Sequence, residues 1–291
     1  MQQNPTTNKF TLRQATAADL NALSAFFKSR INIYHHLDWR SSLEWLGYQP
    51  YYLLMRRGDI LAAMASPIDP EGISWIRVFG ASIELPPEKM FPILFDQCAK
   101  DLSIEPKPVI AALGLHDWFI KTLELNQFEL YQHIVALDWN YRQKHARPVP
   151  AGLQIRQMIA ADLPAVAQVD RQAFNPLWQN SLDALILAFH QASIATVAVL
   201  DNKIVGYQIS TSTPINTHLA RLAVDPAWQR QNIGFELVRD MLTASVKINS
   251  WEITVNTQFE NKASLALYET LDFTKTAETF PVYVYRRPEN K

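Results

Sequence analysis

Apolar and polar positions in the second half of the chain follow strand-like and helix-like spacings in turn. After Gly234, the apolar residues Leu237, Val238, Met241 and Leu242 recur at i, i+1, i+4 and i+5, which predicts one buried helix face. The full series of predicted elements is strand 153–158, helices from 160 and over 181–191, strands 196–200, 203–211 and 218–224, helix 234–246, strand 252–256, helix 262–270 and a closing strand pair ending at 285. This order predicts a mixed α/β sheet with helices on both faces.

The chain also repeats itself. Leu-Arg-Gln-Ala-Thr-Ala-Ala-Asp-Leu at 12–20 and Ile-Arg-Gln-Met-Ile-Ala-Ala-Asp-Leu at 155–163 are identical at six of nine positions. Two later pairs of segments, 57–61 with 201–205 and 125–128 with 270–273, line up at nearly the same offset. A duplication settles the architecture more firmly than any single element. We therefore expect two copies of one α/β unit, divided within the polar stretch 141–152.

A run of polar residues separates the strand 218–224 from the helix 234–246. It lies in Val-Asp-Pro-Ala-Trp-Gln-Arg-Gln-Asn-Ile-Gly at 224–234. The first amides of a helix have no partner within the helix and attract anions, phosphate above all. Gly234 offers a close approach to the backbone, and Arg230 adds positive charge. Asn232 is also a preferred helix N-cap residue, so these residues alone fit either a phosphate site or a capped turn.

A second constellation follows at 256–269. At about 100° per residue, Asn261, Ser264 and Tyr268 fall on one face of the predicted helix, and its apolar residues fall on another. Such a polar stripe either lines a cleft or is a solvated face with a half-buried tyrosine.

Together the two stretches resemble the motifs of the GNAT N-acetyltransferases. The family's acetyl-CoA motif has Arg or Gln, two residues, Gly, one residue, then Gly or Ala. Gln229 matches its first position and Gly234 its last, while Asn232 replaces the middle glycine. Asparagine tolerates left-handed backbone angles better than other non-glycine residues, so we expect the loop to keep its shape. The stretch from Asn261 through Leu-Tyr-Glu resembles the family's second motif.

The resemblance implies a tandem GNAT protein. Each half would be a GNAT-like α/β domain with a mixed, mostly antiparallel sheet flanked by helices. Residues 146–291 would be the catalytic N-acetyltransferase domain, and residues 1–145 a degenerate, non-catalytic one. The implied reaction is direct transfer of an acetyl group from acetyl-CoA to a primary amine of a small-molecule or peptide acceptor. Other readings are a non-catalytic acyl-CoA-binding or regulatory module and, disfavoured by the balanced charge, a tRNA-dependent aminoacyl transferase.

The resemblance also implies roles for particular residues. Tyr268 would be the general acid that protonates the CoA thiolate, and the Val224 N–H would polarise the thioester carbonyl. The implied cofactor contacts are the strand edge Leu222, Ala223 and Val224, the loop amides of Gln229, Arg230, Gln231, Asn232, Ile233, Gly234 and Phe235, and the side chains of Asn256 and Asn261. The general base is open: His218 is one candidate, Glu252 a second, and a purely structural His218 the alternative.

The same junction differs in the first half. It reads Ile-Glu-Leu-Pro-Pro-Glu at 83–88, where two prolines remove backbone donors and Glu84 and Glu88 add negative charge. Aligning Phe128 with Phe273 places Leu123 opposite Tyr268, so the acid is missing as well. We expect this half neither to bind CoA in the usual cleft nor to catalyse.

Composition and charge narrow the possible partners and the cellular compartment. The 291 residues carry a net charge of −1, which gives no electrostatic case for a nucleic acid or membrane-surface partner. The one cysteine, Cys98, lies on an apolar helix stripe and fits a buried thiol in a reducing compartment. With no signal-like N-terminus and no long apolar run, we expect a cytoplasmic protein, monomeric or homodimeric. We interpret His-His-Leu-Asp at 35–38 as solvated loop residues and expect no metal.

Overall fold

The computed structural model describes residues 10–28, 32–140 and 147–287, which form two compact units. The first unit comprises residues 1–131 and 281–291, and the second comprises residues 132–280. Strand β8 (Phe128–Trp139) passes from the first unit into the second, and β14 (Phe273–Tyr285) returns. The predicted boundary, between residues 145 and 146, lies outside the described residues.

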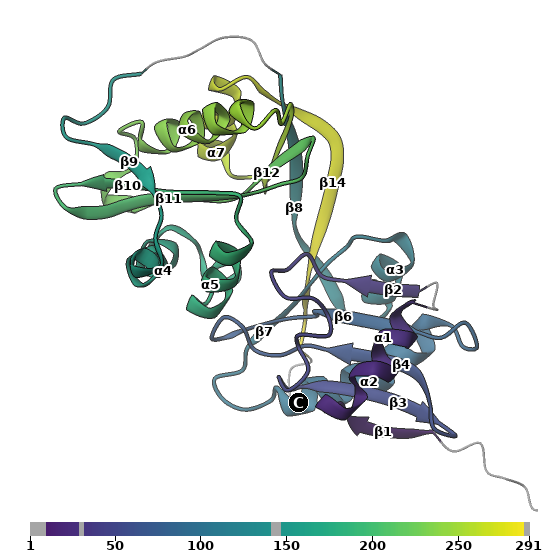
Figure 1. Cartoon of the computed structure of the whole chain (residues 1–291). Coiled ribbons are helices and arrows are strands. Elements are labelled where there is room, and N and C mark those ends of the chain that lie inside the picture. The colour runs from purple at the N-terminus through teal and green to yellow at the C-terminus, as the bar shows by residue number, and fades with distance from the viewer. Residues whose placement is uncertain (1–9, 29–31, 141–146, 288–291) are drawn as a thin grey trace, which may run out of the picture. The chain divides into compact units, whose positions relative to one another are not determined.

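The second unit is a mixed sheet with helices on both faces, as predicted. Helices α4 (Leu163–Ala173) and α5 (Leu182–Gln191) cover one face, and α6 (Ile233–Lys247) and α7 (Lys262–Thr270) cover the other (Figure 1). Next to β8 and β14, the strand order is β13 (Glu252–Gln258), β12 (Asn216–Val224), β11 (Lys203–Ser212), β10 (Ile194–Leu200) and β9 (Gln154–Gln157). The predicted closing strand pair is wrong: residues 273–285 form the single long strand β14.

The apolar positions that the sequence predicts to lie on one helix face form the buried face of α6. Leu237, Val238 and Met241 are fully buried, and Leu242 is nearly so. They pack with residues of β12 and β13 in the core on this side of the sheet. Burial of this stripe is what fixes the helix, and hence its N-terminus, against the sheet.

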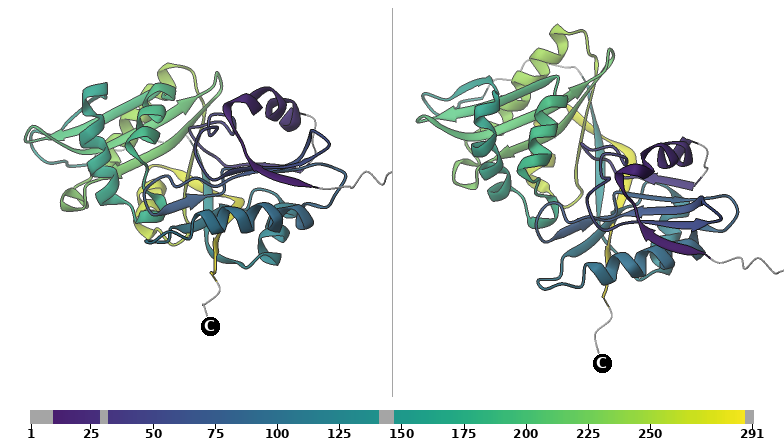
Figure 2. Two further views of the ribbon diagram at one scale, coloured as in Figure 1. Left: turned by 90° about the horizontal axis from the view of Figure 1, so that it is seen from below. Right: turned by 60° about the horizontal axis from the view of Figure 1, so that its bottom comes forward.

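The first unit repeats this plan with changes. One sheet has the strand order β1 (Thr11–Gln14), β3 (Tyr51–Arg56), β4 (Asp59–Ala65), β6 (Val78–Ala81) and β2 (Asn32–His35). Helices α1 (Leu20–Lys28) and α2 (Pro87–Asp101) lie on opposite faces of it (Figure 2). The end of β14 pairs with β7 (Val109–Leu113), which also pairs with β5 (Ile73–Trp75) and precedes α3 (Asp117–Leu125). Cys98 is buried in α2, as expected, and burial raises the pKa of its thiol.

The repeated sequence produces the same local structure twice. Arg13 binds Asp19 through two hydrogen bonds of 2.8 and 2.6 Å, and Arg156 binds Asp162 through two of 2.7 and 2.8 Å. Each aspartate also accepts the N–H of the residue three positions earlier, at 2.8 Å from Thr16 and 2.9 Å from Ile159. Each pair fastens a strand, β1 for Arg13 and β9 for Arg156, to the start of the helix that follows it. The duplication is therefore visible in the structure as well as in the sequence.

Candidate active site

Strands β12 and β13 run together and then separate. They pair in parallel only from Asn216 with Glu252 to Leu219 with Val255. Beyond that point β12 pairs with β11 alone as far as Val224, and β13 pairs with β8. Among the described residues, no strand pairs with the edge of β12 from 220 to 224 that faces away from β11. The separation opens a gap between two adjacent strands of the sheet.

The hydrogen-bond pattern fixes which backbone groups face this gap. Asp225 donates its N–H to the Val205 carbonyl at 2.9 Å, so these two residues form a hydrogen-bonded pair across β11 and β12. Bonded and non-bonded pairs alternate in an antiparallel ladder. Val224, opposite Gly206, and Leu222, opposite Gln208, are therefore non-bonded pairs whose N–H and C=O groups point away from β11. Two backbone amides are presented along the open edge.

The loop after β12 delivers the N-terminus of α6. Arg230 and Asn232 both have left-handed backbone angles, with φ of 61° and 60°. Alternation of left-handed residues with ordinary ones makes a concavity lined by N–H groups that suits an anion. The first helical bond runs from the Glu236 N–H to the Asn232 carbonyl at 3.0 Å. The amides of Ile233, Gly234 and Phe235 precede that bond, as expected for the first turn of a helix.

Asn232 is not an ordinary capping residue. Its side chain makes no capping hydrogen bond to the helix, and its backbone is left-handed, with φ 60° and ψ 15°. The Asn232 Nδ2 instead donates to the Pro148 carbonyl at 2.7 Å. Of the two interpretations that the sequence left open, the capped turn is wrong. Asparagine occupies this position because it tolerates the left-handed conformation.

Gly234 joins three elements at the start of α6. A Cβ atom built on it would lie 3.4 Å from Leu267 Cδ2 of α7 and 3.6 Å from Val224 Cγ2 of β12. These are ordinary contact distances, so an alanine fits here. The start of α6, the end of β12 and the middle of α7 therefore meet at this glycine.

Tyr268 of α7 is buried in the same core cluster as Leu219 and Val255, the last residues at which β12 and β13 pair. Its ring packs against Phe273, with 5.6 Å between centroids. No described residue forms a hydrogen bond with its hydroxyl group. Burial raises the pKa of Tyr268, so the phenol keeps its proton at neutral pH. A protonated donor without a protein partner thus lies in the cluster at which the two strands separate.

The family model of the acetyltransferase (GNAT) domain matches residues 163–282. These residues therefore belong to the GNAT acetyltransferases. The match covers α4 to β14, and with them the strand gap, the loop before α6 and Tyr268.

Relatives of known name match a smaller part of the chain. N-alpha-acetyltransferase 30 of Xenopus laevis is 36% identical over 67 residues, which cover 23% of this chain and 24% of that protein. The Homo sapiens protein of the same name is 36% identical over 67 residues, 23% of this chain and 18% of its own length. The match thus spans a quarter or less of these relatives.

Two solved structures resemble nearly the whole chain. A tandem GNAT protein from the clavulanic acid biosynthesis pathway has a TM-score of 0.63 and 11% identity, with 97% of this chain and 100% of that chain covered. A putative acetyltransferase from Pyrococcus horikoshii has a TM-score of 0.60 and 14% identity, with 99% and 93% covered. At such identities the likeness shows the fold, which is that of a tandem GNAT protein.

Within the GNAT domain, the two candidate bases differ in position. His218 lies on the paired part of β12, where its Nδ1 is 2.8 Å from the Thr254 hydroxyl. Burial lowers the pKa of His218, which keeps the imidazole neutral. Glu252 is exposed at the first pair of β12 with β13, three residues before the strands separate. The structure brings His218 nearer to the gap than Glu252.

The two asparagines named from the sequence also differ. Asn261 caps α7, since its Oδ1 accepts the Ser264 N–H at 3.1 Å. Its Nδ2 is 3.4 Å from the Gln258 Oε1. Asn256 is exposed and directly follows Val255, at the point where β13 leaves β12. The contact of either side chain with a cofactor stays a prediction.

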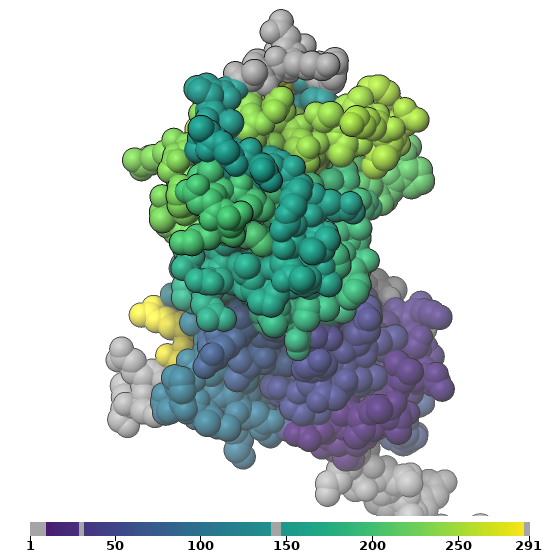
Figure 3. Space-filling model, turned by 60° about the vertical axis from the view of Figure 1, so that its left-hand side comes forward, coloured from purple at the N-terminus to yellow at the C-terminus, as the bar shows by residue number. Residues whose placement is uncertain are grey.

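Sequence reasoning missed a buried cluster on the α4 side of the GNAT domain. Asp170 of α4 accepts hydrogen bonds from Tyr207 of β11 and from Arg221 of β12, the latter from Nε at 2.7 Å. Figure 3 shows the teal residues of the second unit, a colour that includes α4, at the surface of the molecule. An aspartate in a helix and an arginine in a strand carry no sequence signal that pairs them across 51 positions.

The first unit has a strand that bends in the same way, but its open edge is closed. β5 pairs in parallel with β7, and after two residues the chain continues as β6, antiparallel to β4. Ser82 donates its N–H to the Leu61 carbonyl at 2.7 Å, so the backbone N–H and C=O groups of Ala81 and Phe79 point away from β4. The backbone groups of Val224 and Leu222 point away from β11 in the same way. Strand β2 pairs with this edge, Asn32 with Ala81 and Tyr34 with Phe79. The position that is open in the GNAT domain is therefore filled here.

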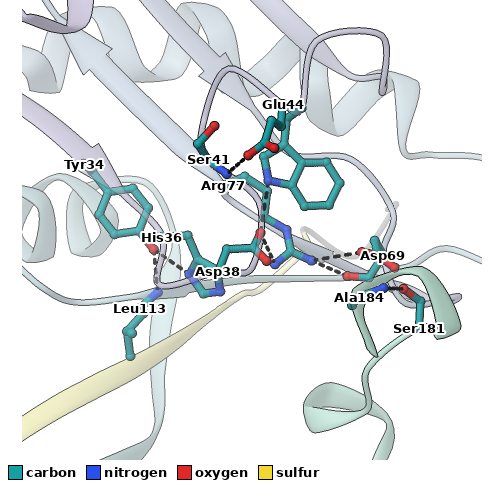
Figure 4. Close-up of polar contacts among 11 residues, drawn as sticks. Tyr34, His36, Asp38, Ser41, Glu44, Asp69, Arg77, Leu113, Ser181 and Ala184 are labelled. Atoms are coloured by element: carbon teal, nitrogen blue, oxygen red, sulfur yellow. Dashed lines mark hydrogen bonds and ion pairs between the residues drawn. The ribbon is translucent and has the colours of Figure 1, made fainter. Parts of the chain in front are cut away.

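The interpretation of residues 35–38 as solvated loop residues holds for His35 and Leu37, which are exposed, and is wrong for His36 and Asp38. His36 is partly buried, and its Nδ1 lies 3.0 Å from the Tyr34 hydroxyl (Figure 4). Its ring stacks on that of Trp75. Asp38 accepts hydrogen bonds from Arg77 and Trp45, both at 3.0 Å (Figure 4). The described residues contain no cluster of three or more potential metal ligands, and none of their helices is long and apolar enough to span a bilayer.

Proposed function

We propose that the GNAT domain transfers an acetyl group from acetyl-CoA to a primary amine. The observation that carries this proposal is the open edge of β12, which leads directly into the unpaired amides at the start of α6. An extended chain of amides, such as pantetheine, pairs with an exposed strand edge, and a pyrophosphate binds at a helix N-terminus. The Leu222 and Val224 backbone groups would bind the first, and the loop from Gln229 to Phe235 the second.

The chemistry needs three groups of the protein. The amine nitrogen attacks the thioester carbonyl, and the Val224 N–H donates to the oxygen on which negative charge develops. As the C–N bond forms, the C–S bond breaks, and the Tyr268 hydroxyl gives its proton to the departing thiolate. His218, neutral at physiological pH, accepts the proton that the amine loses, directly or through water.

The acceptor that best fits these groups is an α-amino group. At pH 7 about a tenth of free α-amino groups are neutral, against about one in a few thousand lysine side chains. A weak base such as His218 is therefore sufficient for an α-amine. The name of the relatives, N-alpha-acetyltransferase 30, supports the same class of acceptor. Peptides with a free N-terminus are the first acceptors to test.

We propose that the first unit neither binds CoA in the equivalent cleft nor catalyses. Strand β2 pairs with the edge of β6 that pantetheine would need. Helix α2 begins with Pro87 after Pro86, so the amides that would bind phosphate are missing at two positions. Leu123, opposite Tyr268 in the repeat, is fully buried. Glu84 and Glu88 contribute less to the difference, since they pair with Arg56 and Lys121.

The test is CoA release with a panel of peptides and small amines, comparing the wild type with Tyr268→Phe. We expect kcat to fall about 10²- to 10⁴-fold, the usual contribution of a general acid, with an unchanged Kd for acetyl-CoA. A Tyr268→Phe variant that keeps wild-type turnover would remove the proposed acid. Saturable acetyl-CoA binding without turnover of any amine would instead indicate an acyl-CoA-binding module.

A further inference from the structure

Residues 147 and 148, which precede the second repeat, are held on the start of α6 by two contacts. The Asn232 Nδ2 donates to the Pro148 carbonyl at 2.7 Å. The guanidinium carbon of Arg147 lies 5.3 Å from the centre of the Phe235 ring. Asn232 and Phe235 belong to the loop that the proposed function assigns to the cofactor phosphates. A positively charged side chain is therefore held beside that loop.

The contact with Phe235 leaves the hydrogen-bond donors of Arg147 unused. A cation within about 6 Å of a ring centre is attracted to the face of the ring. The guanidinium has five N–H donors besides. In the part of the chain that the structure describes, no group accepts a hydrogen bond from them and no carboxylate pairs with Arg147, which is exposed. The guanidinium is thus held in place with its donors free to bind a ligand.

The charges around the start of α6 favour an anion as that ligand. Glu236, the acidic residue of the first turn, binds Arg239, whose Nε lies 3.0 Å from its carboxylate. Asp225 accepts the backbone N–H two residues ahead at 2.9 Å. Arg230 adds a second positive charge, and the first amides of the helix have no partner within it. A planar guanidinium binds a phosphate group through two parallel hydrogen bonds, and a helix start attracts the same group.

We propose that Arg147 binds a phosphate group of the cofactor. This inference rests on the proposed acetyl transfer, which puts CoA at the start of α6. Arg147 lies outside residues 163–282, which the GNAT family model matches, so the resemblance gives it no role. Its place over Phe235, whose own amide is among the unpaired amides of the first turn, is what assigns it to this site.

Asn232 has a positioning role in this arrangement. It stands where the motif of the family has a glycine, and its backbone is left-handed. A glycine would adopt the same backbone angles but would have no side chain to bind Pro148. The departure from the motif therefore supplies the hydrogen bond that holds Pro148, and with it the neighbouring Arg147, at the phosphate site.

The experiment measures the Kd of CoA and of 3′-dephospho-CoA by calorimetry for the full-length wild type and Arg147→Met. Methionine keeps an apolar side chain over Phe235 and removes the charge and the donors. At low salt we expect the Kd of CoA to rise about tenfold, and the rise should shrink at about 0.5 M NaCl, which screens an exposed charge. An equal rise for 3′-dephospho-CoA would assign Arg147 to the pyrophosphate, and no rise would assign it to the 3′-phosphate.

Two further variants test the specificity of the effect. Arg171→Met is the matched control, because it removes an exposed arginine of α4, on the other face of the sheet (Figure 1), and its Kd should equal that of the wild type. Asn232→Gly should also weaken CoA binding. Adding Arg147→Met to Asn232→Gly should then cost less than it does in the wild type, because both changes remove the same contact.

Three results would overturn the inference or part of it. A wild-type Kd in Arg147→Met, or a rise that is the same at both salt concentrations, would exclude the phosphate role and leave the proposed acetyl transfer intact. Losses that add in full would show that Asn232 does not position Arg147. A wild-type protein that binds no CoA would remove the proposed function, and the role of Arg147 with it.

Discussion

The two units present the same strand edge in opposite states. In the GNAT domain, β12 leaves β13 after Leu219, and among the described residues no other strand pairs with its edge at Leu222 and Val224, although the Val224 carbonyl accepts a hydrogen bond from the Gln229 Nε2 at 3.0 Å. In the first unit, β6 offers the corresponding edge at Phe79 and Ala81, and β2 pairs with it along four residues. The free edge of the duplicated strand can thus pair with a ligand in the GNAT domain, whereas in the first unit β2 already pairs with it.

The comparison teaches that loss of a site need not disturb the fold around it. In the first unit, β2 pairs with the edge of β6 and two prolines remove backbone donors at the start of α2, while the apolar core stays in place. The bend itself is kept in both units, and each has an arginine at or beside it, buried for Arg77 and partly buried for Arg221. Arg77 fastens the segment after β2 through Asp38 (Figure 4), and Arg221 fastens the segment after α4 through Asp170.

The largest expected effect on cofactor binding comes from giving the start of α6 a proline like those at the start of α2. Gly234→Pro removes one amide from the proposed phosphate site, and proline is tolerated in the first turn of a helix, as Pro164 of α4 shows. Loss of a hydrogen bond to a charged group costs about 1.5–3 kcal/mol, so the Kd for acetyl-CoA should rise about 10- to 100-fold. Isothermal titration calorimetry measures this directly.

Gly234→Ala is the matched control for that variant. It adds the same Cβ at ordinary contact distance from Leu267 and keeps the N–H. Its Kd should stay close to that of the wild type. If alanine and proline weakened acetyl-CoA binding equally, the added side-chain atoms, and not the lost amide, would be the cause. The missing amides at the start of α2 would then not explain the difference between the two units.

The next largest expected effect is on stability and compares two buried tyrosines, Tyr34 and Tyr268. Tyr34 accepts the Leu113 N–H at 3.3 Å, across the place where the GNAT domain has its gap. Tyr34→Phe leaves that buried amide unsatisfied, so the free energy of unfolding should fall by about 1–3 kcal/mol. Tyr268→Phe removes a hydroxyl without a partner among the described residues and should leave stability nearly unchanged. Chemical denaturation of the two variants gives the comparison.

The same pair of variants should separate stability from binding. Tyr34→Phe is expected to leave the acetyl-CoA Kd of the folded protein unchanged, because the proposal gives the first unit no part in binding. A clear change in Kd for Tyr34→Phe would contradict the division of roles between the units.

Much of the GNAT domain could be predicted because its signals are local. The apolar stripe of α6, the polar loop before it and the stripe with Tyr268 each lie within a few turns of sequence, and the repeat supplied the domain plan. For Asn232 the sequence left two roles possible, a helix cap or part of a phosphate-binding loop. Its left-handed backbone, without a capping hydrogen bond, excludes the first. The cofactor contacts and the identity of the base remain predictions.

What the sequence did not reveal depends on pairing between distant residues. β2 is a strand of four residues, Asn-Ile-Tyr-His, with mixed polarity, and it exists because β6, more than 40 positions later, offers an edge. Asp170 and Arg221, and Asp38 and Arg77, are likewise brought together only by the sheet. Charged residues in such positions look solvated until the tertiary structure buries them.

The smallest predicted effect tests what the two units share. Arg156 and Arg13 lower the pKa of Asp162 and Asp19 below the usual value near 3.9. Because the folded state favours the ionised carboxylates, their contribution is complete above pH 4 and is lost as the pH falls through the folded pKa. Asp162→Asn and Asp19→Asn should each cost about 1 kcal/mol at pH 7, the usual value of such a cap, and the loss should shrink below pH 4. Urea denaturation at pH 7 and pH 3.5 measures both, and a loss that persists undiminished at the lower pH would show that the charges are not its source.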